Sequence, residues 1–265
     1  MNYAHRIVCL TEETTETLYL MGEDWRIVGI SGFTVRPARA RKEKPRVSAF
    51  TSAKIDKILE LKPDLVLGFS DLQADIAAQL VRHGTEVHVF NHRSVAEIFR
   101  MIRTVGGLIG RESKAAALAD ELDRKLEAVR AGAAALARRP RVYFEEWDEP
   151  QISAIRWVSE LLEIAGGNDC FPELARESLG KNRIIADRLE VPRRAPDIIF
   201  GSWCGKKFQP GAVASRPGWE AVPAVRDGEL HEIKSAIILQ PGPAALTDGV
   251  QALHARIAAW SAKRG

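Results

Sequence analysis

The chain has few cysteines and none of them is paired in a motif. Cys9, Cys170 and Cys204 are three thiols at wide spacings. No C-x-x-C pair occurs, so the sequence contains no recognisable zinc site or redox dithiol. We interpret these three residues mainly as small hydrophobic side chains that the fold buries.

Long apolar runs and a strong charge of one sign are also missing. The apolar stretches are broken within a few residues, so we expect no membrane-embedded segment. Lys plus Arg number 38 against 35 Asp plus Glu, and the net charge of +3 is spread along the chain. This small surplus predicts no nucleic-acid partner. With 265 residues, 46% of them hydrophobic, the chain can form one large domain or two smaller ones.

The common catalytic and phosphate-binding motifs do not occur. Residues 106–110 contain three glycines, but they end a helix and no G-K-[ST] follows, so nucleotide binding is not predicted. No G-x-S-x-G elbow is present. His88 and His92 lie four apart and could approach a metal, yet no third ligand has a recognisable spacing, so we predict no metal site and no intrinsic cofactor. No catalytic residue is predicted.

Short apolar runs alternate with amphipathic stretches, the pattern of βα units around a mostly parallel sheet. Strands are predicted at residues 6–11, 27–31, 64–69 and 86–90, and in the second half at 141–145, 197–200 and 229–233. Helical periodicity covers residues 55–61, 76–81, 153–165 and 244–261. The fold class is therefore α/β.

One predicted helix is much longer than the others. Apolar residues recur every three or four positions from Leu118 to Leu136, with charges on the opposite face, which predicts one helix over residues 113–138. Such a helix would be about 39 Å long. We expect it to connect an N-terminal lobe, residues 1–112, to a C-terminal lobe, residues 139–265.

Ligands of open α/β sheets bind beyond the carboxyl ends of the strands. Unusually many aromatic residues follow the predicted strands, and five such rings favour a pocket for a bulky, partly flat ligand. Each ring taken alone could equally cover its own hydrophobic core. The ligand-binding residues predicted from these positions are Phe33, Thr34, Phe50, Phe69, Asp71, His92, Glu146, Trp147, Trp203 and Cys204.

Acidic residues gather between Glu145 and Glu149. They form either a solvated turn before Pro150 or a patch that receives a ligand's amides, hydroxyls or positive charge. Adjacent residues of a strand point to opposite faces, so Glu145 and Glu146 cannot both enter one site, and a glycosidase is disfavoured.

An ordered set of short motifs covers nearly the whole chain. These are Arg6-Ile-Val-Cys-Leu-Thr11, Thr15-Glu16, Gly22, Val28-Gly-Ile-Ser31, Lys62-Pro-Asp-Leu-Val66, Gly106-x-x-x-Gly110, Leu161-x-x-x-Ala165-Gly-Gly-Asn168 and Ala195-Pro-Asp-Ile-Ile199. In this order they resemble the cobalamin and ferric-siderophore binding proteins of ABC importers, and the sequence is most similar to the cobalamin binders.

The resemblance implies two Rossmann-like lobes joined by a single long rigid helix, with the ligand in a cleft between the lobes. It implies a solute-binding protein rather than an enzyme, with cobalamin or a related corrinoid as the ligand. Phe33, Phe50 and Phe69 would flank the corrinoid, and the second-lobe contacts would lie around Trp147, Ile152 and Trp203.

The resemblance also implies a partner, an ABC transporter permease whose arginines contact one acidic residue per lobe. Glu16 fits this role in the first lobe. In the second lobe the position falls on Asp187, Leu189 or Glu190, of which Asp187 and Glu190 are acidic. The predicted first strand starts at Arg6 and leaves no room for a leader, so we expect a cytoplasmic protein. A natural leader that had been removed would place it in the periplasm.

Two other functions fit the same residues. One keeps the binding role and changes the ligand to a ferric chelate or haem. The other is a cytoplasmic enzyme that acts on a corrinoid precursor, with Glu146, Asp148, His92 or Cys204 as acid, base or nucleophile. No spacing in the sequence pairs any of these side chains with a catalytic partner.

Overall fold

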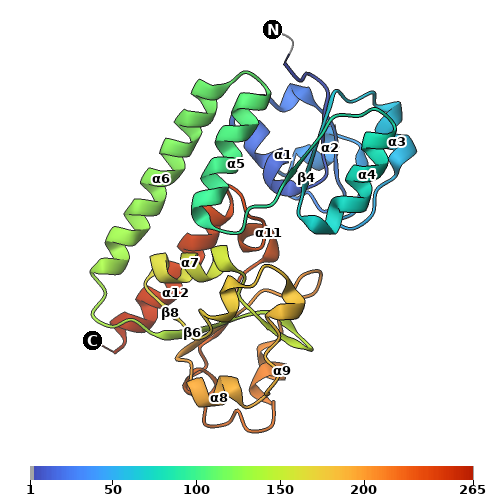
Figure 1. Ribbon diagram of the computed structural model, residues 1–265. Coiled ribbons are helices and arrows are strands. Elements are labelled where there is room, and N and C mark those ends of the chain that lie inside the picture. Colours follow the sequence, from blue (N-terminus) through green and yellow to red (C-terminus); the bar gives the residue numbers. More distant parts are fainter. Residues whose placement is uncertain (1–2, 265) are drawn as a thin grey trace. The chain divides into compact units, whose positions relative to one another are not determined.

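The computed structural model describes residues 3–264 and divides into two compact units. Unit 1 takes the chain up to His92, then Ala96–Leu122 and Pro241–Pro243. Unit 2 consists of Arg93–Val95, Asp123–Gln240 and the chain from Ala244 onward. Each unit is built on its own β-sheet (Figure 1).

Unit 1 contains a five-stranded parallel sheet in the order β3-β2-β1-β4-β5. The strands are β1 (Ile7–Cys9), β2 (Ile27–Ser31), β3 (Arg46–Ser48), β4 (Leu65–Phe69) and β5 (Val87–Phe90). The first-half helices are α1 (Glu12–Leu20), η1 (Asp24–Arg26), α2 (Ala40–Glu43), α3 (Ile55–Glu60), η2 (Asp71–Gln73), α4 (Ala74–Arg82), α5 (Val95–Leu108) and α6 (Glu112–Ala134). Helix α6 contributes residues to both units.

The core of unit 1 forms where the apolar faces of its helices meet the sheet. Ile58 of α3 and Ile76 and Leu80 of α4 pack with Val8 and Val66 of the central strands. On the other side of the sheet in Figure 1, α1 and α5 lie together, and Thr17 of α1 contacts Met101 of α5. Because helices cover both faces, β1 and β4 are buried throughout, as is usual for a parallel sheet.

Unit 2 has a sheet in the order β10-β9-β6-β7, with β8 also paired to β6. All pairs are parallel except β6 with β7. The strands are β6 (Arg141–Asp148), β7 (Gln151–Ser153), β8 (Asn168–Asp169), β9 (Ile198–Gly201) and β10 (Leu230–Glu232). The helices are α7 (Arg156–Ala165), η3 (Leu174–Arg176), η4 (Gly180–Asn182), α8 (Glu190–Arg194), α9 (Pro210–Ala214), α10 (Pro223–Arg226), α11 (Ser235–Ile238), η5 (Ala245–Gly249) and α12 (Val250–Ala262).

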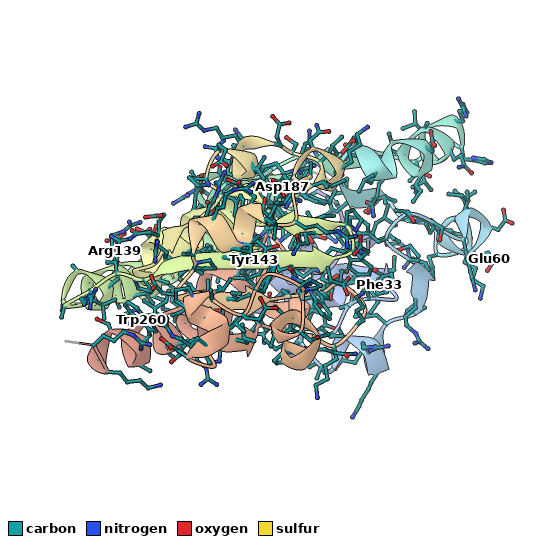
Figure 2. The ribbon with its side chains drawn as sticks, turned by 90° about the horizontal axis from the view of Figure 1, so that it is seen from below. Phe33, Glu60, Arg139, Tyr143, Asp187 and Trp260 are labelled. Carbon is teal, nitrogen blue, oxygen red and sulfur yellow. The ribbon has the colours of Figure 1, made fainter. Side chains whose placement is uncertain are left out.

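The core of unit 2 is rich in aromatic rings on one side of its sheet. Tyr143, near the middle of β6 (Figure 2), lies edge-on to Phe171 and Trp219. Trp203 and Phe208 belong to the same buried cluster, with ring centroids 5.0 Å apart. Helices α7 and α12 pack against each other on the other side of β6 (Figure 1). The α/β prediction is therefore confirmed for both units.

The predicted helix over residues 113–138 ends earlier, at Ala134. The next amides, of Ala135 and Leu136, bond three residues back instead of four, which tightens and closes the helix. The prediction of a helix from Ser153 was wrong at its start, because Ser153 belongs to β7 and α7 begins at Arg156.

Candidate functional site

The carboxyl edge of the unit 1 sheet carries the first predicted aromatic residues. Phe33 lies two residues beyond the end of β2 and is 57% exposed, while Phe50 is half-buried. The Phe33 amide donates to Ser31 Oγ at 3.2 Å, which fixes the turn that presents the ring. The adjacent Thr34 is buried, and its hydroxyl has no hydrogen-bond partner among the described residues. An exposed ring beside a buried hydroxyl is thus present at this edge.

Phe69 and His92 lie together in the interior rather than at the surface. Their ring centroids are 5.0 Å apart in an edge-on arrangement, and both side chains are buried. His92 Nε2 lies 2.7 Å from the carbonyl oxygen of Pro241. That ring nitrogen is engaged by the backbone, so it is not presented to a ligand.

Gln73 joins the segments that contain Phe50 and Phe69 through hydrogen bonds to their backbones. The sequence did not predict a role for this residue. Its side-chain amide donates to the Phe50 carbonyl at 2.8 Å, and its Oε1 accepts from the Phe69 amide at 2.9 Å. Asp71 begins the same turn and accepts a hydrogen bond from Ser70 Oγ at 2.9 Å. Nothing in the sequence marks Gln73, because a single glutamine after a strand is usually a solvated residue.

Two glutamates open helix α1 immediately after β1, and both are buried. Burial, reinforced by the neighbouring Glu13, raises the pKa of Glu12 to about 8. Burial likewise raises the pKa of Glu13 to about 7, although a hydrogen bond from Thr11 opposes the rise. Buried carboxyl groups at this position were not among the predicted site residues.

The acidic residues of β6 are paired with cations of their own unit. Glu145 is fully buried and accepts from Arg216 at 2.5 and 2.9 Å, from Tyr143 at 3.1 Å and from Trp203 Nε1 at 3.0 Å. Glu146 points elsewhere and pairs with the buried Arg183 at 2.6 and 3.1 Å. The expected divergence of these two side chains is therefore confirmed.

The last two acids of this stretch are paired as well. Asp148 accepts from Lys206 at 2.5 Å, and Glu149 accepts from Arg188 at 2.8 Å. Burial raises the pKa of Asp148, but the hydrogen bond from Lys206, the charge of that lysine and backbone hydrogen bonds together hold the pKa below its ordinary value. The acidic stretch is thus a set of ion pairs.

The second-unit aromatic residues differ in exposure. Trp203 is buried in the core, and Trp147 at the end of β6 is half-buried, with its Nε1 donating to the Glu149 carbonyl at 2.9 Å. Ile152 is half-buried on β7, paired across the hairpin with Trp147. Cys204 follows β9 and is exposed. Trp147 is therefore the accessible ring at this edge of unit 2.

The residues predicted to dock on a permease also have partners. Glu16 accepts from Arg36 Nε at 2.9 Å. Asp187 is exposed and pairs with Arg193, and Glu190 pairs with Arg193 and Arg194. Leu189 is exposed between them.

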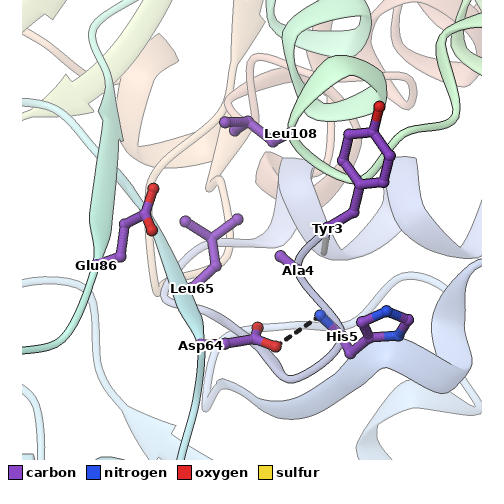
Figure 3. Close-up of a pocket in the computed structure, with 7 residues that line it drawn as sticks. All are labelled: Tyr3, Ala4, His5, Asp64, Leu65, Glu86 and Leu108. Atoms are coloured by element: carbon purple, nitrogen blue, oxygen red, sulfur yellow. Dashed lines mark hydrogen bonds between the residues drawn. The ribbon is translucent and has the colours of Figure 1, made fainter. Parts of the chain in front are cut away.

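A pocket of about 340 Å³ lies at the opposite, amino edge of the unit 1 sheet (Figure 3). Asp64 and Leu65 at the start of β4 and Glu86 before β5 line it, together with Tyr3, Ala4, His5 and Leu108. Asp64 accepts the backbone amides of His5 and Arg6 at 2.8 and 2.9 Å, so it fixes the incoming chain. None of the predicted site residues lines this pocket.

Within residues 3–264 no group of three or more His, Cys, Asp or Glu side chains is arranged to hold a metal ion. Across the same residues, no helix combines the length and hydrophobicity needed to cross a membrane.

Comparison with known proteins covers almost the whole chain. The family model described as periplasmic binding protein matches residues 7–237. The ABC transporter substrate-binding lipoprotein YvrC of Bacillus subtilis is 25% identical, over 94% of this chain and 78% of its own length. The vitamin B12-binding protein of Vibrio vulnificus is 23% identical, over 91% of this chain and 86% of its own.

Solved structures share the fold. A possible iron-binding (periplasmic solute-binding) protein from Staphylococcus epidermidis superposes with a TM-score of 0.83 at 21% identity, covering 97% of this chain and 99% of its own. The Vibrio cholerae vitamin B12-binding protein has a TM-score of 0.76 at 22% identity, covering 97% and 98%. The haem-binding protein RhuT from Roseiflexus has a TM-score of 0.80 at 22% identity, covering 96% and 99%.

Proposed function

Because the chain belongs to the periplasmic binding protein family, we propose that it captures a corrinoid and delivers it to the permease of an ABC transporter. Family members bind solutes and are not enzymes, which supports capture over catalysis. The side chains considered for an enzyme support this too, since Glu146 and Asp148 each form an ion pair within unit 2.

The observation that carries the corrinoid proposal is the ring of Phe33, more than half exposed at the carboxyl end of β2. An exposed phenylalanine lacks the free energy that burial of its ring would contribute. A broad, partly apolar ligand that covers the ring would provide that burial. Relatives named for vitamin B12 point to a ligand of that shape.

The hydrogen bond of His92 also favours a corrinoid. Haem bound by a protein usually receives an axial ligand from a side chain. At the unit 1 edge the candidate was His92, whose Nε2 is hydrogen-bonded to the Pro241 carbonyl. Cobalamin carries its own axial ligands, so apolar contact and hydrogen bonds are enough to hold it.

The test uses two aromatic residues at opposite ends of β2. Phe33 follows the strand and Trp25 precedes it, and their side chains are 57% and 55% exposed. Cyanocobalamin affinity is measured by equilibrium dialysis for wild type, Phe33→Ala and Trp25→Ala. We expect Phe33→Ala to weaken binding by about tenfold, the loss of one buried aromatic contact, and Trp25→Ala to leave it unchanged. Wild type that does not bind at tens of micromolar contradicts the proposal.

A second candidate ligand is haem, which the exposed thiol of Cys204 favours. A cysteine thiolate can serve as an axial ligand of haem iron, and Cys204 follows β9 at the carboxyl edge of unit 2. Hemin titration with Cys204→Ser separates the two ligands. A Soret band of bound hemin that changes in Cys204→Ser supports haem as the ligand. A Soret band that stays the same in Cys204→Ser, together with a higher affinity of wild type for cyanocobalamin than for hemin, supports the corrinoid.

A further inference from the structure

Lys206 occupies an unusual position at the carboxyl edge of the unit 2 sheet. Its ammonium nitrogen lies 4.2 Å from the centroid of the Trp147 ring and 5.0 Å from that of Trp203. The same nitrogen donates to Asp148 Oδ1 at 2.5 Å. Two indole rings and a carboxylate thus hold one exposed ammonium group in place.

A tight turn places the lysine there. The Lys206 amide donates to the Trp203 carbonyl at 3.4 Å, and Gly205 between them has a φ of +79°. A positive φ at the third position of such a turn suits glycine, which has no Cβ. The sequence Trp203-Cys-Gly-Lys206 therefore folds the lysine back over its own tryptophan.

The ammonium keeps hydrogen-bonding capacity. A lysine has three N–H donors, and among the described residues Lys206 gives one hydrogen bond, to Asp148. Two donors remain for another acceptor. The neighbouring Lys207 is exposed and contacts no aromatic ring within residues 3–264, so it offers the same charge without the fixed position.

We infer that Lys206 selects ligands that carry a carboxylate at the edge of their ring system over ligands whose side chains are all amides. This inference rests on the proposed function, because it places the ligand beside Trp147. A macrocycle lying against Trp147 would bring its peripheral groups to the ammonium. A carboxylate gains a charge-assisted hydrogen bond there, which is about twice as strong as the bond that a neutral amide oxygen gains.

Lys206 can bind a ligand without breaking its existing contacts. The pair of Lys206 with Asp148 is partly exposed, and exposed pairs contribute little, so the lysine can share its donors with a ligand. Because Asp148 stays bound to the ammonium, the lysine is held near the two tryptophan rings while it donates to the ligand. Unit 2 therefore presents a positioned cation to the ligand rather than a mobile one.

The experiment compares two corrinoids that differ in one functional group. Cyanocobalamin has only amide side chains at the corrin edge, and its monocarboxylate derivatives replace one amide by an acid. Affinity for both is measured with wild type, Lys206→Gln and Lys207→Gln. We expect wild type and Lys207→Gln to prefer the monocarboxylate by about fivefold, and Lys206→Gln to show no preference.

The outcomes separate the two proposals. Equal affinity of wild type for both corrinoids overturns the selection by Lys206 and leaves the corrinoid function standing. A preference that survives in Lys206→Gln overturns it as well. Failure of wild type to bind either corrinoid overturns the proposed function and this inference together.

Discussion

Glu145 and Arg216 form a two-point ion pair inside unit 2, with Nη1 2.5 Å from Oε2 and Nη2 2.9 Å from Oε1. Glu145 is fully buried in the carboxyl half of β6, and Tyr143 and Trp203 donate to the same carboxylate. The pair thereby joins β6 to the segment that follows α9.

Removing the arginine leaves a buried charge without its partner. We expect Arg216→Ala to lower the free energy of unfolding by about 3 kcal/mol, since an isolated buried carboxylate is strongly unfavourable. Urea denaturation followed by tryptophan emission measures the change. Arg188→Ala, which breaks the exposed pair with Glu149, serves as the control and should cost less than about 1 kcal/mol. Equal losses for the two variants would contradict the assigned role of Glu145.

Buried Glu13 makes stability depend on pH. Its pKa rises from an ordinary 4.5 to about 7 in the folded chain, chiefly because it is buried. The folded state then holds a proton that the unfolded state has released, so its contribution is complete below about pH 4.5 and is lost as pH rises through 7. The loss amounts to on the order of 3 kcal/mol.

Glu13→Gln removes this titration while keeping the shape of the side chain. Urea denaturation at intervals from pH 5 to 8 should show wild type losing stability relative to Glu13→Gln as pH rises. A constant difference between the two proteins across that range would show that Glu13 is ionised in the folded state throughout.

Two glycines of unit 2 should respond to alanine in opposite directions. A Cβ on Gly201 would lie 1.8 Å from Cδ2 of the buried Phe208, whereas a Cβ on Gly211 in α9 meets nothing within 4 Å. We expect Gly201→Ala to cost about 2–3 kcal/mol through overpacking. Gly211→Ala should stabilise by about 0.5 kcal/mol, because alanine favours the helix. Thermal denaturation distinguishes them, and an unaffected Gly201→Ala would mean that Phe208 can move aside.

The three thiols should differ in reactivity. Burial raises the pKa of Cys9 and of Cys170 to about 12, whereas Cys204 is exposed. A thiol reagent on the native protein should therefore modify one cysteine rapidly, and Cys204→Ser should abolish that phase. If the ligand binds at the carboxyl edge of unit 2, saturating cyanocobalamin should slow the same reaction. Unchanged labelling in the presence of a bound ligand would place the ligand elsewhere.

Buried strands could be predicted from the sequence because their composition is simple. Apolar runs such as Ile27–Ser31 and Leu65–Phe69 are the central strands of a parallel sheet, and the prediction of β2 matched its observed bounds. Strand β3 was missed, because Arg46 and Ser48 leave only Val47 as an apolar residue. Strand β7 was missed because its three residues pair across a hairpin at Pro150, and its last residue, Ser153, was assigned to the predicted helix over residues 153–165.

The candidate site was predictable in position but not in detail. Phe33 lies beyond the carboxyl end of β2, as the parallel arrangement requires, whereas Trp147 belongs to β6 itself, near its end. Their role in binding stays a prediction. Burial of Phe69 and Trp203 depends on partners distant in the sequence, Pro241 beside His92 in one case and Glu145 in the other. Lys206 was not identified, because its position over the two tryptophans depends on a turn geometry and not on a motif.

The interleaved composition of the two units affects how the protein is made. Unit 1 includes Pro241–Pro243, and the Pro241 carbonyl is the acceptor for His92 149 residues earlier. A ribosome must therefore translate past Pro243 before this unit has all of its parts. A nascent chain released shortly after α6 would lack them, so neither half can be cut out as a contiguous fragment with its contacts complete.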